Sequence, residues 1–538
     1  MNQLLKVTFK LLCLTIFVLG LTSNLFFDNN PFVQAQGSEF QIGEETGRIL
    51  RVEHATEAVV HTYLNRADFN MAIATAMIDS EERIFLAYMK NTGAEKGGQA
   101  AIEIAMLEND QWSYQIIDDE TLADSHNVAS LVVDGENYIH ITYDMHDTPW
   151  KYKVSACPGT IECGFEDRPS QLPGEMISYP RYWRTPNGDL LHGWRADILN
   201  SENWPEGTVE GGERMAAQAF AFYDTSQKEW KDAQVVGGDG SFNGDEYGWS
   251  NGSGGVGIGP DGRIHTVWGW IKWDEFGNQG GSPYVYDFSY AWKYQDDLIW
   301  HNRYDVPYYS LPIGRTEADI IVPKEDFEKN SLCPYVLVDL NNTVHLIFET
   351  GYDENTSIYH LKFPYNGDWT SPEKIMNGWY PDAAIDQDGT LTVISYNGKL
   401  ARSLDGGDTW ATEEPFDIFP SDILEADGFS SVKIDQAYMY DTGKLRLYAV
   451  TRGSLYLIDI ELVSTAGTSP IATPPPSIPG DLDGDWDVDI FDLVIVGNSF
   501  GKSPGESGYD SRADADTSGG AIDIFDLITV GSHFGDVG

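Results

Sequence analysis

The sequence is poor in positive charge, in long apolar runs and in helical heptad repeats. Only 34 of its 538 residues are Lys or Arg against 84 Asp or Glu, a formal net charge of −50. This charge argues against binding to nucleic acid or to an anionic membrane, and an anionic polymer would have to be held by local Arg and His side chains. Abundant aromatic, Gly and Pro residues without heptads favour β-structure with many turns.

The first 36 residues have the pattern of a signal peptide. Lys6 and Lys10 precede an apolar run over residues 11–21, and Val33-Gln34-Ala35 offers a small-residue cleavage site. The alternative, a membrane anchor, is less favoured because the run is shorter than the ~20 residues that span a bilayer. No later segment is apolar enough to hold the chain in a membrane. We therefore expect a secreted protein, extracellular or attached to the cell surface.

Cysteine is scarce, with four residues in the chain. Cys13 belongs to the expected signal peptide, whereas Cys157 and Cys163 bracket the turn-like loop PGTIE, so these two are the expected disulfide in an oxidising compartment. Cys333 has no obvious partner. A buried thiol is favoured for it over a structural metal ligand.

One unit recurs between about residues 66 and 460: a strand, a tight turn, an apolar strand, and one or two further strands. The expected turns are DSEER (79–83), DGEN (134–137), PNGD (186–189), GPDG (259–262), DLNN (339–342), DQDG (386–389) and YDTGK (440–444). The strands that follow are IFLAY, YIHITY, LLHGW, IHTVW, VHLIF, LTVIS and LRLYA. Such spacing is typical of four-stranded propeller blades, so we predict an all-β fold with a seven-bladed β-propeller.

A second marker of this fold is RSLDGGDTW, which begins at Arg402. Its Ser403, Asp405, Gly407, Thr409 and Trp410 resemble the Asp-box turn of sialidase-like (BNR-like) propellers. In that turn the Asp holds backbone N–H groups and the Trp packs between strands. The resemblance implies a structural role for Asp405.

The composition changes after Leu462. We expect a propeller domain over residues 37–465, a semi-rigid Pro/Ser/Thr linker over 466–479 and a small module over 480–538. In DLDGDWDVDIFD, carboxylates occupy loop positions 1, 3, 5, 7, 9 and 12, which is the ligand spacing of a Ca²⁺ loop rather than of a solvated acidic run. These residues are Asp481, Asp483, Asp485, Asp487, Asp489 and Asp492.

The calcium-loop pattern returns as DADTSGGAIDIFD, and IFDLVIVGNSFG is echoed by IFDLITVGSHFG. Two Ca²⁺ loops, each followed by a helix, resemble a dockerin, the module that docks enzymes onto cohesin domains. The resemblance implies a small α-helical, Ca²⁺-binding domain and a cohesin-bearing scaffold protein as partner. Trp486 stands where Gly is usual, and the second loop is one residue longer than usual. Its expected ligands are Asp514, Asp516, Asp523 and Asp526.

Two hairpins carry polar residues at their open ends. His126 and His146 lie at equal distances from the turn at 134–137, to within one residue, so the two should face each other. Tyr179 and Arg195 have the same relation to the next turn, at 186–189. Equivalent hairpins of adjacent blades are parallel copies. The four side chains are therefore expected in one cleft over the propeller face.

The motifs HN, MH, SYPR and WR at these spacings resemble BNR-4-type propellers, a group that includes seven-bladed ulvan lyases. The resemblance spans roughly residues 66 to 460. It implies a polysaccharide lyase that cleaves 4-linked uronic acid in an ulvan-like, anionic polysaccharide. Related propellers are glycosidases that act on rhamnose–glucuronate linkages.

The four residue types suit β-elimination, which needs a base for the C5 proton, an acid for the leaving oxygen at C4, and a cation for the carboxylate. His126 and Tyr179 are the candidate base and acid, in an order that can depend on the sugar epimer. Arg195 would bind the carboxylate with both nitrogens of its fork, and His146 would position substrate or assist proton transfer. The scheme requires no metal or other cofactor.

Two alternatives share the scaffold: a glycoside hydrolase, and a non-catalytic glycan-binding propeller. A sialidase is disfavoured because an Asp box alone supplies neither the arginine triad nor the Tyr/Glu pair of those enzymes. Single histidines at strand ends are more often satisfied polar residues than catalysts, and Tyr before Pro is common in packing, so a structural role is the alternative for the candidate residues. His140, His192 and His265 lie within strands, and we assign them to the fold.

Overall fold

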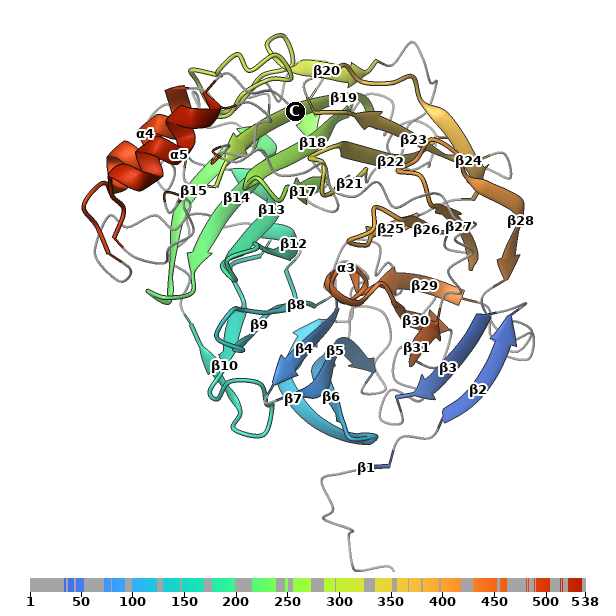
Figure 1. Cartoon of the computed structure of the whole chain (residues 1–538). Coiled ribbons are helices and arrows are strands. Elements are labelled where there is room, and N and C mark those ends of the chain that lie inside the picture. Colours follow the sequence, from blue (N-terminus) through green and yellow to red (C-terminus); the bar gives the residue numbers. More distant parts are fainter. Residues whose placement is uncertain are drawn as a thin grey trace, which may run out of the picture.

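Seven antiparallel sheets surround a common axis in the computed structural model of the chain (Figure 1). The structure describes residues 33–34, 37–42, 45–52, 72–78, 80–91, 99–122, 129–145, 148–168, 177–198, 215–238, 247–249, 255–271, 285–295, 297–323, 334–350, 356–365, 367–378, 381–395, 398–417, 429–451, 455–461, 480, 482, 488, 490–503, 513, 515 and 521–534. The seven-bladed propeller expected from the turns is confirmed.

The first three blades follow one another along the chain. Blade 1 has the order β1-β7-β6-β5-β4, with β1 Val33–Gln34, β4 Ile73–Ile78, β5 Glu81–Asn91, β6 Gln99–Glu108 and β7 Gln111–Leu122. Blade 2 has the order β11-β10-β9-β8, with β8 Ser130–Val133, β9 Ile139–Thr142, β10 Tyr152–Ser155 and β11 Phe165–Asp167. Blade 3 has the order β12-β13-β14-β15, with β12 Ile177–Arg184, β13 Leu190–Ile198, β14 Met215–Asp224 and β15 Glu229–Gly237.

The next three blades continue around the axis. Blade 4 has the path β16-β18-β19-β20 with β17 also paired to β18: β16 Tyr247–Trp249, β17 Val256–Ile258, β18 Arg263–Ile271, β19 Val285–Tyr294 and β20 Asp319–Val322. Blade 5 runs β21 Tyr335–Val338, β22 Val344–Thr350, β23 Ser357–Phe363 and β24 Glu373–Asn377. Blade 6 runs β25 Asp382–Ile385, β26 Leu391–Ile394, β27 Lys399–Ser403 and β28 Ala411–Asp417.

Blade 7 closes the ring with strands from both ends of the propeller. Its order is β2-β3-β31-β30-β29, with β2 Gly37–Ile42, β3 Glu45–Arg51, β29 Phe429–Ile434, β30 Leu445–Thr451 and β31 Leu455–Glu461. Leu50 of β3 pairs with Leu457 of β31. Because backbone hydrogen bonds join the two ends, the ring has no free edge there. β1, within the segment expected to be a signal peptide, pairs with β7.

Aspartates shape several of the tight turns. In blade 2 the Asp134 carboxylate accepts hydrogen bonds from the backbone N–H groups of Glu136 (2.9 Å) and Tyr138 (2.8 Å). Asp339 and Asp386 make the same pair of contacts in blades 5 and 6. These bonds satisfy turn donors that would otherwise be left without a partner, which is why Asp is favoured there.

The prediction of a seventh tight turn, at 440–444, is wrong, because the segment is the end of a helix. The connection between β29 and β30 is a helix, α3 Gln436–Thr442, which packs beside the axis (Figure 1). Asp435 caps its first turn by accepting from the N–H of Tyr438, and Gly443 ends it with a φ of 67°. The sequence signal was an N-cap Asp and a C-terminal Gly rather than a turn alone.

The Asp-box expectation is confirmed. Asp405 accepts hydrogen bonds from the Thr409 N–H (2.8 Å), the Thr409 hydroxyl (2.6 Å) and the Ser403 hydroxyl (2.8 Å). Trp410 packs against the core between blades 5 and 6. Cys157 and Cys163 form the expected disulfide, with Cα atoms 5.8 Å apart. Cys333 lies outside the described residues.

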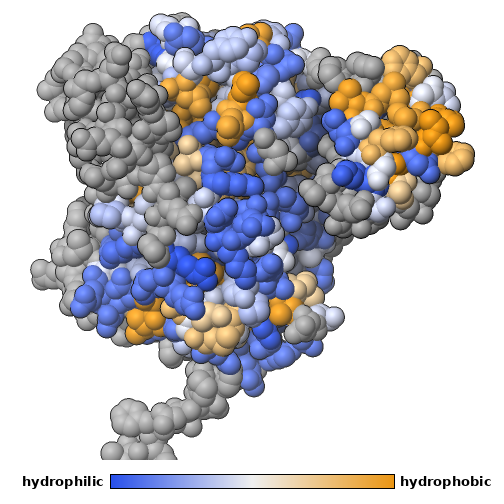
Figure 2. Space-filling view, turned by 90° about the vertical axis from the view of Figure 1, so that its left-hand side faces the viewer, coloured by the Kyte–Doolittle hydropathy of each residue, from blue (hydrophilic) through white to orange (hydrophobic). Residues whose placement is uncertain are grey.

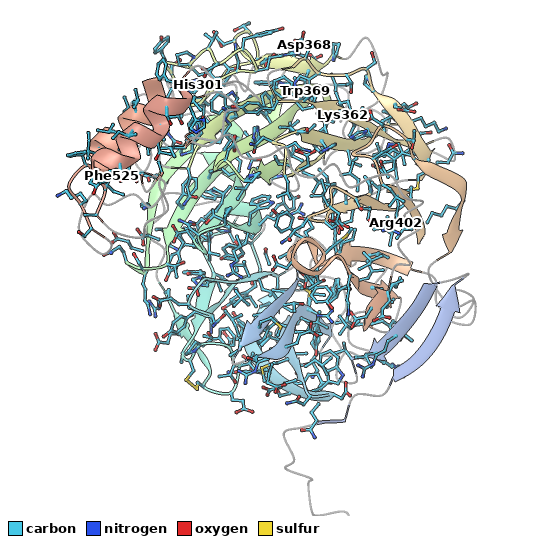
Figure 3. All side chains as sticks on the ribbon, in the orientation of Figure 1. His301, Lys362, Asp368, Trp369, Arg402 and Phe525 are labelled. Carbon is cyan, nitrogen blue, oxygen red and sulfur yellow. A yellow bond between two sulfur atoms is a disulfide. The ribbon has the colours of Figure 1, made fainter. Side chains whose placement is uncertain are left out.

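Hydrophobic side chains fill the spaces between blades, and a separate small core lies C-terminal to the propeller. That core contains Val488, Val496, Ala513, Ile522 and Val530 and is formed around two helices, α4 Ile490–Ser499 and α5 Ile524–His533. Phe525 marks this helix pair outside the ring of blades (Figure 3). Among the described residues, no helix is long and apolar enough to cross a membrane.

Candidate functional site

Tyr179 occupies a bulge in the innermost strand of blade 3. Ser178 pairs with Arg195, Arg181 pairs with Gly193, and the register shifts between these pairs, so Tyr179 and Pro180 lie in the irregular part. Proline has no N–H to continue the ladder, which favours a break there. Tyr179 has a φ of 55°, a backbone conformation that is unusual for a bulky residue.

The bulge brings Tyr179 and Arg195 together. The Arg195 guanidinium carbon lies 4.8 Å from the centre of the Tyr179 ring, and its Nη2 donates to the Ser178 hydroxyl at 3.0 Å. Both side chains are 5% exposed. The residue directly opposite Arg195 is Ser178 rather than Tyr179, which corrects the expected pairing by one position because of the bulge.

The neighbouring blades carry two similar arrangements at the same end of the propeller. Asp144 follows the end of β9 with a φ of 53° and forms an ion pair with Lys151. Asp287, near the start of β19, has a φ of 54° and accepts from Arg315 Nε at 3.0 Å. In an antiparallel sheet, the end of the second strand and the start of the third meet at one edge.

Blades 2, 3 and 4 thus each place a residue of positive φ beside a cation at this end. Sequence reasoning missed Ser178, Asp144, Lys151, Asp287 and Arg315. The signal was weak: Asp tolerates the left-handed region more readily than most residues, but the pattern does not show where it will do so.

The two predicted histidines, His126 and His146, lie outside the described residues. The part of their hairpin that is described pairs Ser130 with Thr142 and Val133 with Ile139. That register is centred on the expected turn. That the two histidines lie opposite each other stays a prediction.

The three strand histidines are buried, which agrees with their assignment to the fold. His140 is fully buried, with Nε2 3.0 Å from Asp134 Oδ2 and Nδ1 2.6 Å from the Tyr152 hydroxyl. Burial lowers the pKa of His140, and it holds the pKa of His192 well below the usual range. For His265, burial and then the charge of Arg263 lower the pKa to about 3. These imidazoles are therefore neutral at neutral pH.

Three of the ten predicted calcium ligands are described. Asp492 is 0% and Asp526 1% exposed, and they sit in the first turns of α4 and α5. Asp492 accepts from the N–H of Leu482 at 2.5 Å, and Asp526 from the N–H of Asp523 at 2.8 Å. Within the described ranges, no three His, Cys, Asp or Glu side chains are grouped to hold a metal. The other ligands lie outside these ranges: Asp481, Asp483, Asp485, Asp487, Asp489, Asp514 and Asp516.

Solved structures with a similar fold include three chains that are 12–14% identical to this one. An ulvan lyase described as a new family of polysaccharide lyase, PL25, bound to -[GlcA(1-4)Rha3S]-, has a TM-score of 0.51. It is 14% identical, over 76% of this chain and 95% of its own. A second structure of a PL25 ulvan lyase gives a TM-score of 0.52 with the same identity and coverage.

The polysaccharide lyase Uly1 also gives a TM-score of 0.52, at 12% identity over 77% of this chain and 99% of its own. Likeness at this identity establishes the fold alone. No curated protein matches the sequence. A family model described as "BNR repeat-containing family member" matches residues 83–375, which is more than half of the chain and includes the Tyr179 bulge. The chain therefore belongs to the BNR repeat-containing family.

Proposed function

We propose that this protein is a secreted polysaccharide lyase that cleaves 4-linked uronic acid in an ulvan-like polysaccharide by β-elimination. The observation that carries the proposal is the Tyr179–Arg195 pair, in which a phenol held at a φ of 55° lies 4.8 Å from a guanidinium. A strained backbone of this kind costs on the order of 1–3 kcal/mol and is commonly retained where function requires it. The similar fold of ulvan lyases supports the substrate class.

Each proposed residue has a role in the elimination. A base, His126 or Tyr179, removes the C5 proton of the uronate. The electron pair forms the C4–C5 double bond, the C4–O bond breaks, and the other residue of the pair protonates the departing oxygen. Arg195 neutralises the charge that spreads into the carboxylate, and His146 positions the sugar or assists proton transfer.

The Tyr179 assignment is tested by Tyr179→Phe, with His126→Ala as the partner variant. Each should lower turnover by about 10²-fold or more, because the proton-transfer group is lost while the strand stays intact. Tyr182→Phe is the matched control: Tyr182 lies on the same strand, but its ring stacks on His192 in the core, 4.3 Å between ring centres. Turnover within threefold of wild type for both Tyr179→Phe and His126→Ala would remove these residues from the mechanism.

We further propose that residues 480–538 are a dockerin that binds two Ca²⁺ ions and docks the enzyme onto a cohesin-bearing scaffold. The support is chemical: the buried Asp492 and Asp526 carboxylates occupy equivalent positions at the starts of α4 and α5. Bound Ca²⁺ would supply the charge that these loops of clustered carboxylates require to fold.

The surface of the helix pair suits a docking role. Hydrophobic residues gather on the lobe at the upper right of Figure 2, whereas hydrophilic residues cover most of the remaining coloured surface. Six large apolar side chains of this region are about half exposed: Val494, Phe500, Ile524, Phe525, Ile528 and Phe534. An apolar surface of this kind is typical of protein–protein contact.

A further inference from the structure

Arg181 is a buried guanidinium on the innermost strand of blade 3. The side chain is 2% exposed, and within the part of the chain that the structure describes its Nε has no hydrogen-bond partner. Its guanidinium carbon lies 5.5 Å from the centre of the Trp183 ring and 5.2 Å from that of Tyr335. We find no hydrogen bond or ion pair from Arg181 to any other residue that the structure describes.

Tyr335 supplies a second unused donor beside Arg181. It is 2% exposed, and its hydroxyl oxygen accepts a hydrogen bond from Lys433 Nζ at 2.8 Å. Burial raises the pKa of Tyr335, so the phenol keeps its proton at neutral pH. That proton is donated to no acceptor among the described residues. Lys433, itself 4% exposed, places a second positive charge at the same phenol.

These residues meet at the propeller axis, next to the candidate site. Arg181 comes from β12, Tyr335 from β21 and Lys433 from β29, the innermost strands of blades 3, 5 and 7 (Figure 1). Arg195 pairs with Ser178, and Gly193, two residues along β13, pairs with Arg181. At roughly 3.3 Å per residue, Arg181 is displaced from Arg195 by about 7 Å along the strand direction, toward the turn end.

The carboxylate that acts on Tyr335 already has hydrogen-bond donors of its own. One carboxylate, Asp382, acts on Tyr335, and it already accepts from the Ile434 N–H at 2.7 Å and the Ala383 N–H at 3.0 Å. An unpaired buried charge is costly, and a group that offers only acceptors would relieve the cost by taking the free donors of Arg181 and Tyr335.

We propose that Arg181 and Tyr335 bind an oxyanion, a sulfate or a carboxylate, at the propeller axis directly beneath the candidate site. The guanidinium gives two parallel N–H donors and the phenol a third, while the Lys433 charge adds attraction. The ligand is either a free inorganic anion or a substituent of a bound polymer, since both offer the same oxygens. The site does not depend on the proposed lyase activity.

The test is the melting temperature of the full chain in sodium sulfate from zero to roughly 10 mM, at constant ionic strength set with sodium fluoride. A ligand that binds the native state raises the melting temperature until the site is saturated, and we expect a rise of about 2 °C or more for the wild type. General exclusion of sulfate acts at higher concentrations and does not saturate. Arg181→Met should abolish the saturable rise, and Tyr335→Phe should weaken the apparent affinity about tenfold, the loss expected from one hydrogen bond.

Arg83→Met is the matched control. It removes one charge, but Arg83 bonds to Glu108 and to the Gly159 carbonyl, near the turn end of blade 1. The sulfate response should therefore stay as in the wild type.

Without sulfate, Arg181→Met should melt no lower than the wild type, because the variant lacks the unpaired charge. If Arg181→Met does not fold, Tyr335→Phe carries the test. A wild type without a saturable rise, or variants that keep it unchanged, would overturn the site.

Adding an oligosaccharide of glucuronate and 3-sulfated rhamnose distinguishes the two sources of the anion. If its sulfate or carboxylate occupies the site, a saturating amount should remove the response to free sulfate. If the site holds a free anion, the response should persist. Either result supports the anion site, and neither requires the protein to cleave the oligosaccharide.

Discussion

At the scale of single residues, the backbone of Tyr179 is the most informative feature. A φ of 55° is an unfavourable backbone conformation for tyrosine. It occurs where Pro180 and the register shift interrupt the regular pairing of β12. As a result, the phenol ring lies 4.8 Å from the guanidinium carbon of Arg195. Tyr182, on the same strand, shows the ordinary alternative, since its ring is buried against His192.

Arg195→Lys tests how the uronate carboxylate is held. Lysine keeps the charge but loses the planar fork and the stacking on the Tyr179 ring, so kcat/KM on a uronate polymer should fall by about tenfold or more. Arg83→Lys, near the turn end of blade 1, is the control and should leave kcat/KM unchanged. Unaltered kinetics for Arg195→Lys would mean that the carboxylate is bound by another residue.

At the scale of elements, the middle strands of the blades repeat one buried feature. His140, His192, His265 and His345 lie on β9, β13, β18 and β22, and all are nearly inaccessible to water. Nδ1 of His265 is 2.7 Å from the Tyr290 hydroxyl, and Nδ1 of His345 is 3.1 Å from His360 Nε2. These contacts link the second strand of a blade to its third.

The buried histidines predict how stability depends on pH. Burial lowers the pKa of His265 and of His360 to about 3, below the roughly 6.5 of an unfolded chain. Between these values the unfolded state binds more protons. The free energy of unfolding should therefore fall as the pH drops below about 6.5, by up to about 1.4 kcal/mol per pH unit for each such histidine.

Urea unfolding between about pH 7 and pH 4 measures this slope. His265→Gln should be less stable than the wild type at pH 7, because it loses the contact with Tyr290, but should lose less stability on acidification. An equal slope for the variant and the wild type would show that other groups control the acid response.

The elements also show what the sequence could and could not reveal. The seven repeats could be predicted from the sequence because Asp, Gly and Asn are favoured at turn positions for local reasons. One example is the Asp134 carboxylate, which accepts hydrogen bonds from the N–H groups of Glu136 and Tyr138. The proximity of Tyr179 and Arg195 followed from hairpin symmetry. The one-residue shift in their pairing did not, because a bulge depends on the balance of backbone strain and packing. Arg181 is part of the SYPR motif. Its lack of a hydrogen-bond partner among the described residues could not be predicted, because it depends on contacts between blades that no local pattern encodes.

At the scale of the whole molecule, one ring and one helix pair have separate hydrophobic cores. The seven propeller clusters draw on residues 49–460, and the eighth draws on residues 482–530. Because the net charge is −50, cationic groups are few in this protein. In the two proposals above, Arg195 and Arg181 would provide the local attraction for anions that the overall charge does not.

The separation of the cores predicts a calcium response confined to the C-terminal module. Adding Ca²⁺ to chelated full-length protein should increase the helical signal in far-ultraviolet circular dichroism, because the clustered carboxylates repel one another without a cation. A chain that ends at residue 465 is the control and should show no change. Both forms should retain the same activity on soluble polymer. Identical spectra of the full-length protein with and without Ca²⁺ would contradict the dockerin proposal.

The most direct test of the proposed lyase is the product that it leaves. Elimination creates a C4–C5 double bond in the uronate, which absorbs in the ultraviolet, whereas hydrolysis yields reducing ends without that absorbance and a binding protein yields neither. Incubation with ulvan, glucuronan and pectic polymers should give a steady rise in absorbance for at least ulvan, and Tyr179→Phe should lose it. New reducing ends without the absorbance, or no cleavage of any of these uronate polymers, would contradict the lyase.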